Sequence, residues 1–275
     1  ASVGLIARGR DGLEAAARDV EEAGGTALIL PCDVASAEAV EEAASQAEAG
    51  LGPVDVWVNN AMATVYSPVW DLTTDEFRRA TEVTYLGTVW GTMAAVRRMK
   101  ARDRGVIVQV GSALSYRAIP LQSAYCGAKF AARGFTDAVR TELIHERSRV
   151  RITSVHLPAV NTPQFSWDRT KLSRHPRPVA PAFQPEPIAE ATWKAAHSRR
   201  REVWPTRRAT LTIVGSKFLQ WPLDLCLGRT GFDAQQTPDE PVDPNRSDNL
   251  DSPVDEDHDF GGHGIFDDQS RSEIR

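Results

Sequence analysis

Stretches of strand-like composition alternate with stretches of helical periodicity along most of this chain. The strand-like runs lie at 1–7, 26–30, 54–58, 106–110, 151–156 and 202–204. The longest helical pattern covers 75–99, and Thr73 and Glu76 before it have the spacing of a capping box. Alternation of this kind predicts a parallel sheet with helices on both faces, so the expected fold class is α/β with a doubly wound, Rossmann-like sheet.

The chain divides by composition into a globular part and an acidic end. It has 275 residues, 41% of them hydrophobic, which suffices for one sizeable core. From Asp233 onward thirteen acidic residues stand against three arginines, a balance of 3 − 13 = −10, which leaves +5 for the rest of the net charge of −5. We therefore expect a Rossmann-type domain over 1–232 and a disordered tail over 233–275, since the tail has little apolar surface to offset ordering.

Tyr125 and Lys129 are four residues apart in a segment that predicts a helix, so their side chains share one face. A nearby lysine cation stabilises a phenolate and lowers a phenol pKa that is ordinarily about 10, which suits proton transfer at neutral pH. Ser112, thirteen positions upstream of Tyr125, follows a strand-like run and is placed to hold a substrate oxygen. Taken alone, the Tyr125 and Lys129 pair has another interpretation, a solvated surface pair.

Together with the strand, the Gly-Ser break and the helix around it, this set resembles the short-chain dehydrogenase/reductase family. The similarity runs from the first residue to about Leu227. The resemblance implies an oxidoreductase that interconverts an alcohol and a carbonyl with a nicotinamide cofactor. It makes Tyr125 the catalytic acid/base, while Lys129 lowers its pKa and binds the cofactor ribose, and Ser112 orients the substrate oxygen.

Two more segments resemble the cofactor wall of the family. Residues 59–62, Asn-Asn-Ala-Met, are similar to an Asn-Asn-Ala-Gly turn after the fourth strand. Residues 158–162, Pro-Ala-Val-Asn-Thr, are similar to a Pro-Gly-x-x-x-Thr segment whose threonine meets the nicotinamide carboxamide. The resemblance therefore assigns to the cofactor Asn60, Ala61, Pro158 and Thr162, in addition to Tyr125 and Lys129.

Thr84 stands where many family members have an asparagine that holds a water of the proton relay. A threonine hydroxyl is also able to hold a water, so Thr84 is a candidate catalytic residue. It is equally well explained as an ordinary helix residue that bonds its own backbone. The sequence leaves both interpretations open.

No Gly-x-Gly-x-x-Gly loop follows a strand and precedes a helix in this chain. By the resemblance, the run at 1–7 is the second strand, and about thirty residues with a strand, a phosphate loop and a helix normally precede it. The chain is therefore expected to lack the first strand and the glycine-rich loop. In the strand order 3-2-1-4-5-6 that first strand is central, so a gap is expected inside the sheet.

Arg8 ends the first predicted strand, where an acidic residue binds the ribose of NAD and an arginine accommodates the additional phosphate of NADP. Ala7 holds the position of the acid and Arg10 is nearby, so NADP is predicted and NAD is the less favoured cofactor. The alternative is that both arginines are solvated charges at a helix start. Asp33, with Val34 beside it, resembles the family's adenine-binding aspartate; the other interpretation is a helix cap or turn.

Residues 158–187 are rich in Pro, Arg and aromatic residues, which is typical of the loop that covers the substrate in this family. Three aromatic side chains line an apolar pocket or pin the loop to the core: Phe165, Trp167 and Phe183. Sugar, steroid, fatty and xenobiotic substrates all remain open.

Residues 209–228 are mostly apolar but are interrupted by Lys217, Pro222 and Asp224, so no transmembrane helix is predicted. The basic residues before them also suit contact with an anionic membrane surface, but a helix packed on the core is favoured. The spacing of His258 and His263 does not indicate a metal site, and no nucleic-acid signature is present. The three cysteines are widely separated, which fits a reducing cytoplasm.

Two classes of function follow from the sequence. The first is an NADP(H)-dependent oxidoreductase acting on a small-molecule alcohol or carbonyl, which the intact set Ser112, Tyr125 and Lys129 favours. The alternative is a catalytically silent or truncated Rossmann-type module that binds a nucleotide or a partner. The resemblance further implies a homodimer or homotetramer, formed partly through the helix at 75–99 and the helix of Tyr125.

Overall fold

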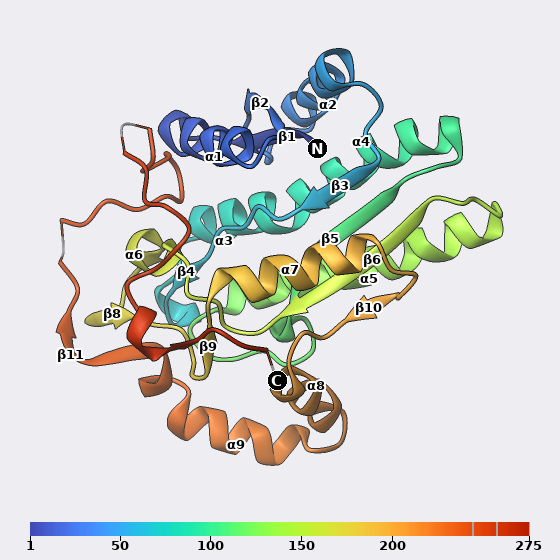
Figure 1. Cartoon of the computed structure of the whole chain (residues 1–275). Helices are drawn as coiled ribbons and strands as arrows, with labels where there is room; N and C mark the ends of the chain where they lie inside the picture. Colours follow the sequence, from blue (N-terminus) through green and yellow to red (C-terminus); the bar gives the residue numbers. More distant parts are fainter. Residues whose placement is uncertain (244, 257, 275) are drawn as a thin grey trace.

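The computed structural model describes residues 1–243, 245–256 and 258–274, and its centre is a parallel sheet in two pieces (Figure 1). In the first piece, β1 (Ser2–Ala7) pairs with β2 (Thr26–Pro31). The second piece has the order β10-β6-β5-β3, from Glu202–Val203, Arg151–Leu157, Val106–Ser112 and Val56–Asn59. Every strand pair of the two pieces is parallel, as expected from the alternation of strands and helices.

Helices cover both faces of the larger piece, with α4 (Gly87–Arg102) and α5 (Ser123–His145) on one face and α7 (Pro185–Ala196) on the other. In addition, α1 (Arg10–Glu22) and α2 (Ala37–Leu51) pack against β1 and β2, and α3 (Thr74–Thr81) packs against α5. Side chains of β5 alternate between the faces: Val106 and Val108 pack with Ala195 of α7, whereas Ile107 packs with Leu143 of α5. The predicted doubly wound α/β fold is confirmed.

The long predicted helix begins with the capping box expected from the sequence. Thr73 Oγ1 accepts a hydrogen bond from Glu76 N at 3.2 Å, and Thr73 N donates to Glu76 Oε2 at 2.8 Å. Between α3 and α4 the backbone changes to a π-helical turn at Glu82–Leu86. Such turns are frequent at functional sites, and this one has Thr84 at its centre.

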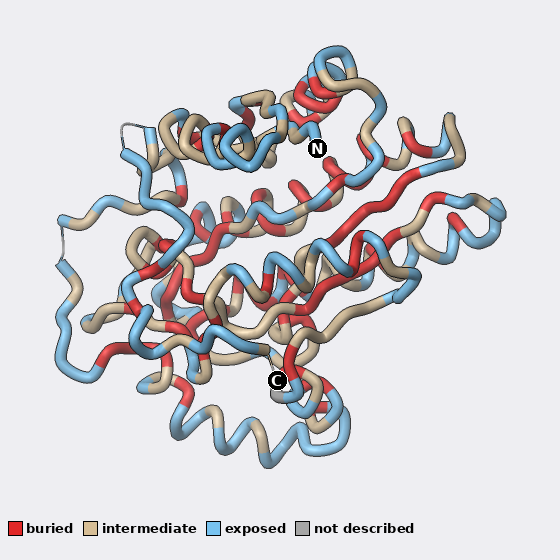
Figure 2. The backbone as a smooth tube through the Cα atoms, in the orientation of Figure 1, coloured by how far each residue is buried: buried red, intermediate tan, exposed pale blue. Residues whose placement is uncertain are grey.

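The two pieces of sheet are not hydrogen-bonded to each other among the described residues. The expected interruption lies between β1 and β3, so β3 has a free edge, and its Val56 and Val58 are 38% and 47% exposed. α2 packs against α4 and joins the pieces through one apolar cluster that includes Val40, Ala44 and Met99. Figure 2 shows the buried backbone concentrated along β5 and β6.

The predicted substrate loop folds into short elements. These are α6 (Gln164–Trp167), β7 (Arg169–Thr170), β8 (Arg174–Pro176) and β9 (Ala182–Phe183), and β7 pairs with β4 (Val65–Tyr66). Phe165 and Phe183 are buried and Trp167 is partly buried, so these aromatic side chains pin the loop to the rest of the chain.

The segment after residue 232 follows the surface of the domain, in contrast to the disorder expected from its composition. β11 (Gln236–Pro241) pairs with β8, and β12 (Ser270–Arg271) pairs with β9. Leu250 is fully buried with Ala63, Val65 and Val83, and Phe266 is 5% exposed. Average composition does not reveal such order, because a few well-placed apolar side chains and backbone bonds produce it.

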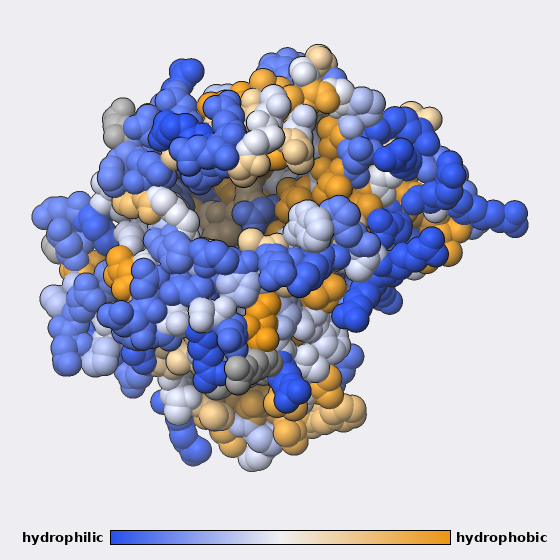
Figure 3. Space-filling view, in the orientation of Figure 1, coloured by the Kyte–Doolittle hydropathy of each residue, from blue (hydrophilic) through white to orange (hydrophobic). Residues whose placement is uncertain are grey.

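The apolar stretch before the tail forms α8 (Arg207–Phe218) and α9 (Gln220–Thr230). No helix of the described chain is long and apolar enough to cross a membrane. α8 buries Ala209 and Ile213, but Phe218 and Trp221 are 81% and 71% exposed. The predicted packing of this stretch on the core is therefore only partly correct, and apolar surface lies over α8 and α9 at the lower edge of Figure 3.

Candidate active site

β5 ends at Ser112 and α5 begins at Ser123, so one strand–loop–helix unit brings the predicted catalytic set to the carboxyl end of the sheet. The Ser112 hydroxyl is buried and accepts a hydrogen bond from Leu114 N at 3.1 Å. Lys129 Nζ donates to Val110 O at 2.8 Å and lies 5.6 Å from the centre of the Tyr125 ring. We call Ser112, Tyr125 and Lys129 the catalytic corner.

Desolvation is the main cause of the pKa shifts of Tyr125 and Lys129 in the catalytic corner. Tyr125 keeps some exposed surface, but the atoms packed around it desolvate the phenol and raise its pKa, and a hydrogen bond with Ser112 only partly opposes this. Desolvation lowers the pKa of Lys129 to about 8. Contrary to the expectation, Lys129 does not lower the Tyr125 pKa in this geometry, because its amine is directed at the Val110 carbonyl and desolvation of the phenol is the main cause of the shift.

Thr84 connects the π-helical turn to the loop after β3. Its Oγ1 donates to Ala63 O and accepts from Ala63 N, both at 2.9 Å. The only hydroxyl proton of Thr84 is thus committed to backbone outside its own helix. This contact matches neither of the two interpretations left open by the sequence, and it fixes the position of the loop.

The turn after β3 has one inward and two outward residues. The Asn59 side chain accepts from Trp57 Nε1 at 2.8 Å and donates to Gln109 Oε1 at 2.8 Å, which anchors the turn to β5. Asn60 and Ala61 are exposed at the carboxyl end of the strand. They are therefore accessible to a ligand, as expected for a cofactor wall.

The segment after β6 holds Pro158 and Thr162, both partly exposed. Between them, Asn161 is fully buried and binds the tail: Nδ2 donates to Asp267 Oδ1 at 2.8 Å and Oδ1 accepts from Phe266 N at 3.1 Å. No role was predicted for Asn161, because its two partners in the tail are more than 100 residues away in the chain.

Asp33 and Val34, at the end of β2, meet the start of the long helix. Burial alone raises the pKa of Asp33, but hydrogen bonds from Arg79 and from the Ala35 amide hold it below its ordinary value. Arg79 lies on α3, 2.5 Å from Asp33 Oδ2, and was not predicted. Val34 lies directly against Gly87 of α4, where an added Cβ atom has no room.

The two arginines at the end of β1 separate in the structure. The Arg8 guanidinium turns to the tail and donates to the carbonyl oxygens of Leu250 at 3.3 Å, Asp251 at 3.1 Å and Asn249. Arg10 instead pairs with an acid of its own helix at 3.1 Å, in solvent. Desolvation lowers the pKa of Arg8, and the nearby Arg79 charge acts in the same direction. We call Arg8, Asp33 and Arg79 the adenosine corner.

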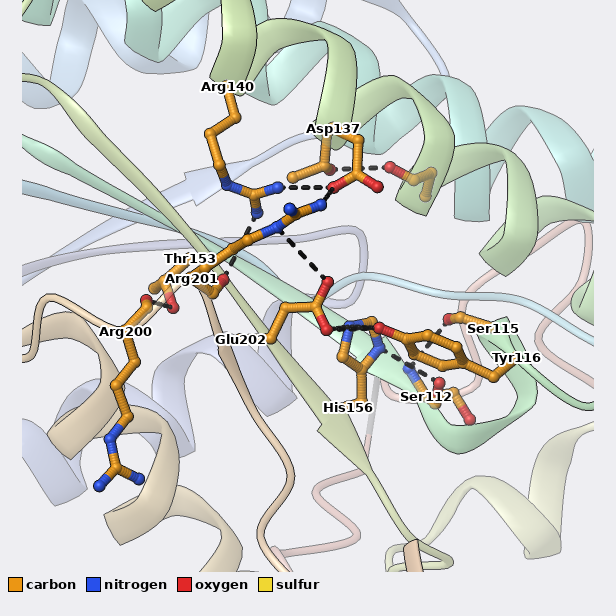
Figure 4. A network of polar contacts seen from close by, with 12 residues as sticks. Ser112, Ser115, Tyr116, Asp137, Arg140, Thr153, His156, Arg200, Arg201 and Glu202 are labelled. Carbon is orange, nitrogen blue, oxygen red and sulfur yellow. Dashed lines mark hydrogen bonds and ion pairs between the residues drawn. The ribbon is translucent and has the colours of Figure 1, made fainter. Parts of the chain in front are cut away.

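A polar network with a buried centre lies behind Ser112 and was not evident from the sequence (Figure 4). His156 of β6 has its Nδ1 3.3 Å from Ser112 O and its Nε2 3.4 Å from Tyr116 Oη. Tyr116 Oη donates to Glu202 Oε2 at 2.5 Å. Burial lowers the pKa of His156 to about 4, so the imidazole is neutral at physiological pH. The network supports the end of β5 that carries Ser112.

Among the described residues, no group of three or more His, Cys, Asp and Glu side chains is arranged to hold a metal ion. Within the same part of the chain all three cysteines are free, two of them buried.

Known proteins with similar sequences and folds indicate the family of this chain. The family model for short chain dehydrogenase matches residues 1–172. The uncharacterized oxidoreductase YxnA of Bacillus subtilis is 31% identical over 221 residues, 79% of this chain and 62% of that protein. The 3-dehydrosphinganine reductase of Danio rerio is 31% identical over 207 residues, 71% of this chain and 61% of that protein. The chain thus spans less than two thirds of the length of these curated relatives.

Two solved structures are similar over 74% of this chain and 84% of their own. An alcohol dehydrogenase from Thermococcus sibiricus, complexed with 5-hydroxy-NADP, is 30% identical with a TM-score of 0.62. A metagenomic short-chain oxidoreductase in complex with NADP is 25% identical with a TM-score of 0.61. With its fold, its catalytic corner and these relatives, the chain belongs to the short-chain dehydrogenase/reductase family of oxidoreductases.

Proposed function

We propose that this chain carries the site of an NADP(H)-dependent oxidoreductase that interconverts an alcohol and a carbonyl, with Tyr125 as the acid/base. The observation that carries the proposal is the meeting of Ser112, Tyr125 and Lys129 at the carboxyl end of the sheet. A buried, protonated phenol next to a serine hydroxyl is suited to carbonyl reduction, because the substrate oxygen then gains a proton.

The cofactor proposal rests on the adenosine corner and on the two NADP-bound relatives. Arg8 and Arg79 bring two guanidinium groups close to each other, and guanidinium groups bind phosphate oxygens in pairs. NADP is therefore favoured over NAD. The other residues proposed to contact the cofactor are Asp33, Val34, Asn60, Ala61, Pro158 and Thr162. No residue of this chain is assigned to the pyrophosphate.

When bound, the cofactor supplies the hydride, and the residues of this chain manage the proton. The Ser112 hydroxyl donates to the substrate oxygen, and Tyr125 Oη transfers its proton to that oxygen. Lys129, with a pKa of about 8, holds a proton close by at physiological pH and binds the nicotinamide ribose. We assign Thr84 a positioning role, because its hydroxyl fixes the loop that leads from Asn60 and Ala61.

Tyr125→Phe tests the mechanism, because it removes only the hydroxyl. We expect NADPH oxidation across a panel of aldehydes and ketones to fall by about 100-fold or more, in the range for loss of a general acid. Tyr85→Phe, a matched change in the same protein, is expected to leave the rate unaltered. Undiminished oxidation by Tyr125→Phe contradicts the proposal.

A nucleotide-binding module without turnover is the second candidate. The Thr84 hydroxyl favours it, because its proton is bonded to Ala63 O and is not free to hold a water of a proton relay. NADPH binding without oxidation of NADPH by any substrate of the panel supports this second candidate.

We further propose that the chain assembles through its long helices into a homodimer or homotetramer. Large apolar side chains are exposed on α3, α4 and α5, namely Phe77, Met93, Phe130 and Ile144. Phe130→Glu places a charge within such an interface and is expected to lower the mass measured by light scattering. An unchanged mass contradicts the assignment of Phe130 to the interface.

A further inference from the structure

Residues 248–255, which we call the acidic strap, cross the adenosine corner. In Figure 1 the chain rises along the left side from β11 to the start of α1. At one end of the strap, Arg169 pairs with Asp248 at 2.9 Å and with Asp251 at 2.7 Å. At the other end, Gly12 N donates to Asp255 O at 3.3 Å. Leu250 is buried between these ends, so the strap is anchored at both ends and in the middle.

The strap occupies the hydrogen-bonding edge of Arg8. Three successive strap carbonyls, those of residues 249–251, accept from the Arg8 guanidinium. Arg79 Nε also donates to Leu250 O, at 3.0 Å, while its NH2 group pairs with Asp33. A phosphate that binds Arg8 through both terminal nitrogens must replace these carbonyl oxygens.

The strap also brings a negative charge to this position. The Asp255 carboxylate lies directly against Gly9 and Gly12, where an added Cβ atom would collide with it. The N-cap of α1 is Gly9, which offers no side chain to the amides of the first turn. An anion is favoured at such a helix start, and a second anion placed beside it is repelled.

We infer that the acidic strap is an internal competitor for the adenosine 2'-phosphate and thereby sets how strongly this chain prefers a phosphorylated cofactor. The strap carbonyls hold Arg8, and Asp255 places its carboxylate near the position proposed for the phosphate charge. Binding of NADP then requires the strap to move, whereas NAD has no 2'-phosphate and leaves Arg8 with the strap. This inference rests on the proposed role of Arg8.

Calorimetric titration of the full chain with adenosine 2',5'-bisphosphate and with 5'-AMP tests the competition, because neither probe requires the pyrophosphate or nicotinamide contacts. Asp255→Asn is expected to tighten bisphosphate binding by about threefold to tenfold, the effect of one partly exposed charge, and to leave 5'-AMP binding unchanged. The matched control is Asp239→Asn, which removes the same charge from the exposed part of β11. It is expected to leave the affinities for the bisphosphate and for 5'-AMP unchanged.

Hydrogen exchange supplies a second readout that does not depend on affinity. Asn249 N donates to Trp167 O and Leu250 N donates to Asp248 Oδ1, so both strap amides are protected in the free chain. Both are expected to exchange faster when the bisphosphate is bound. The competition is overturned if the bisphosphate binds while the exchange rates of both amides stay the same, or if Asp255→Asn does not tighten bisphosphate binding. Either result leaves the NADP proposal intact. If Arg8→Ala binds the bisphosphate like the parent chain, or nothing binds, both proposals are rejected.

Discussion

The catalytic corner and the adenosine corner are built in different ways. Ser112, Tyr125 and Lys129 come from one strand, its loop and the next helix, and Ser112 and Lys129 are buried. The adenosine corner joins the ends of β1 and β2 to α3, and the strap bonds of Arg8 span more than 240 residues. A site made of local, buried contacts is expected to be rigid, whereas one closed by exchangeable polar contacts opens more easily.

Ser112→Ala affects only the catalytic corner if the two corners are independent. The loss of the hydroxyl that we propose orients the substrate is expected to lower turnover by about 100-fold or more. Because Ser112 belongs to a different corner from Arg8, the affinity for adenosine 2',5'-bisphosphate should stay the same. Parallel kinetics and calorimetry check both values, and a loss of affinity contradicts the separation of the corners.

Leu250→Ala tests the anchor of the strap. The side chain is fully buried with Ala63, Val65 and Val83, so its truncation should lower the free energy of unfolding by about 2–4 kcal/mol. Urea denaturation measures this change, with the partly exposed Leu225→Ala on α9 as the control. A loosened strap should also tighten bisphosphate binding. Weaker binding indicates instead that the strap forms part of the binding site.

The carboxyl group of Asp168 is expected to make the stability of the folded chain depend on pH. The residue is fully buried, both carboxylate oxygens have no hydrogen-bond partner among the described residues, and desolvation raises its pKa. The folded chain therefore keeps this proton above the unfolded pKa of about 3.9. Its contribution to stability is present at low pH and is lost as the pH rises through the raised folded pKa.

Asp168→Asn removes this titration with little change in shape. We expect the free energy of unfolding of the variant, relative to that of the parent chain, to rise by about 1–3 kcal/mol between low and neutral pH, in the range for an unsatisfied buried group. Thermal unfolding followed across this pH range is the measurement. If the unfolding temperatures of the two proteins change with pH in parallel, Asp168 does not have a raised pKa in the folded chain.

The smallest effect is expected for Arg10→Ala. Its ion pair with Glu14 is solvent-exposed, with side chains 68% and 44% exposed, and such helix pairs contribute about 0.3–0.5 kcal/mol. Bisphosphate affinity should be unchanged, whereas Arg8→Ala should weaken it. Equal losses of affinity in the two variants show that general positive charge, and not the position of Arg8, attracts the ligand.

Sequence reasoning succeeded where the determinants are local. The alternation of strands and helices, the Thr73 capping box and the spacing of Tyr125 and Lys129 all depend on neighbours within a few residues. The direction of the Tyr125 pKa shift was wrong, because it depends on desolvation by atoms from elsewhere in the fold. Arg79 and His156 were missed for the same reason, since their roles arise only from contacts between elements distant in the chain.

The strap shows the limit of composition as a guide. Thirteen acidic residues after position 232 favour disorder on average, yet Leu250 is fully buried and Arg8 and Arg169 bind the segment on both sides. Only the fold reveals that these basic groups stand opposite the acidic residues.

One titration of NADPH fluorescence on three proteins, the parent chain, Arg8→Ala and Tyr125→Phe, followed by a turnover assay on each, tests both corners together. We expect the parent chain to bind and oxidise NADPH, Arg8→Ala to bind it more weakly, and Tyr125→Phe to bind it like the parent but not to oxidise it. Oxidation of NADPH by Tyr125→Phe at the parent rate, or a parent chain that does not bind NADPH, contradicts the proposed function.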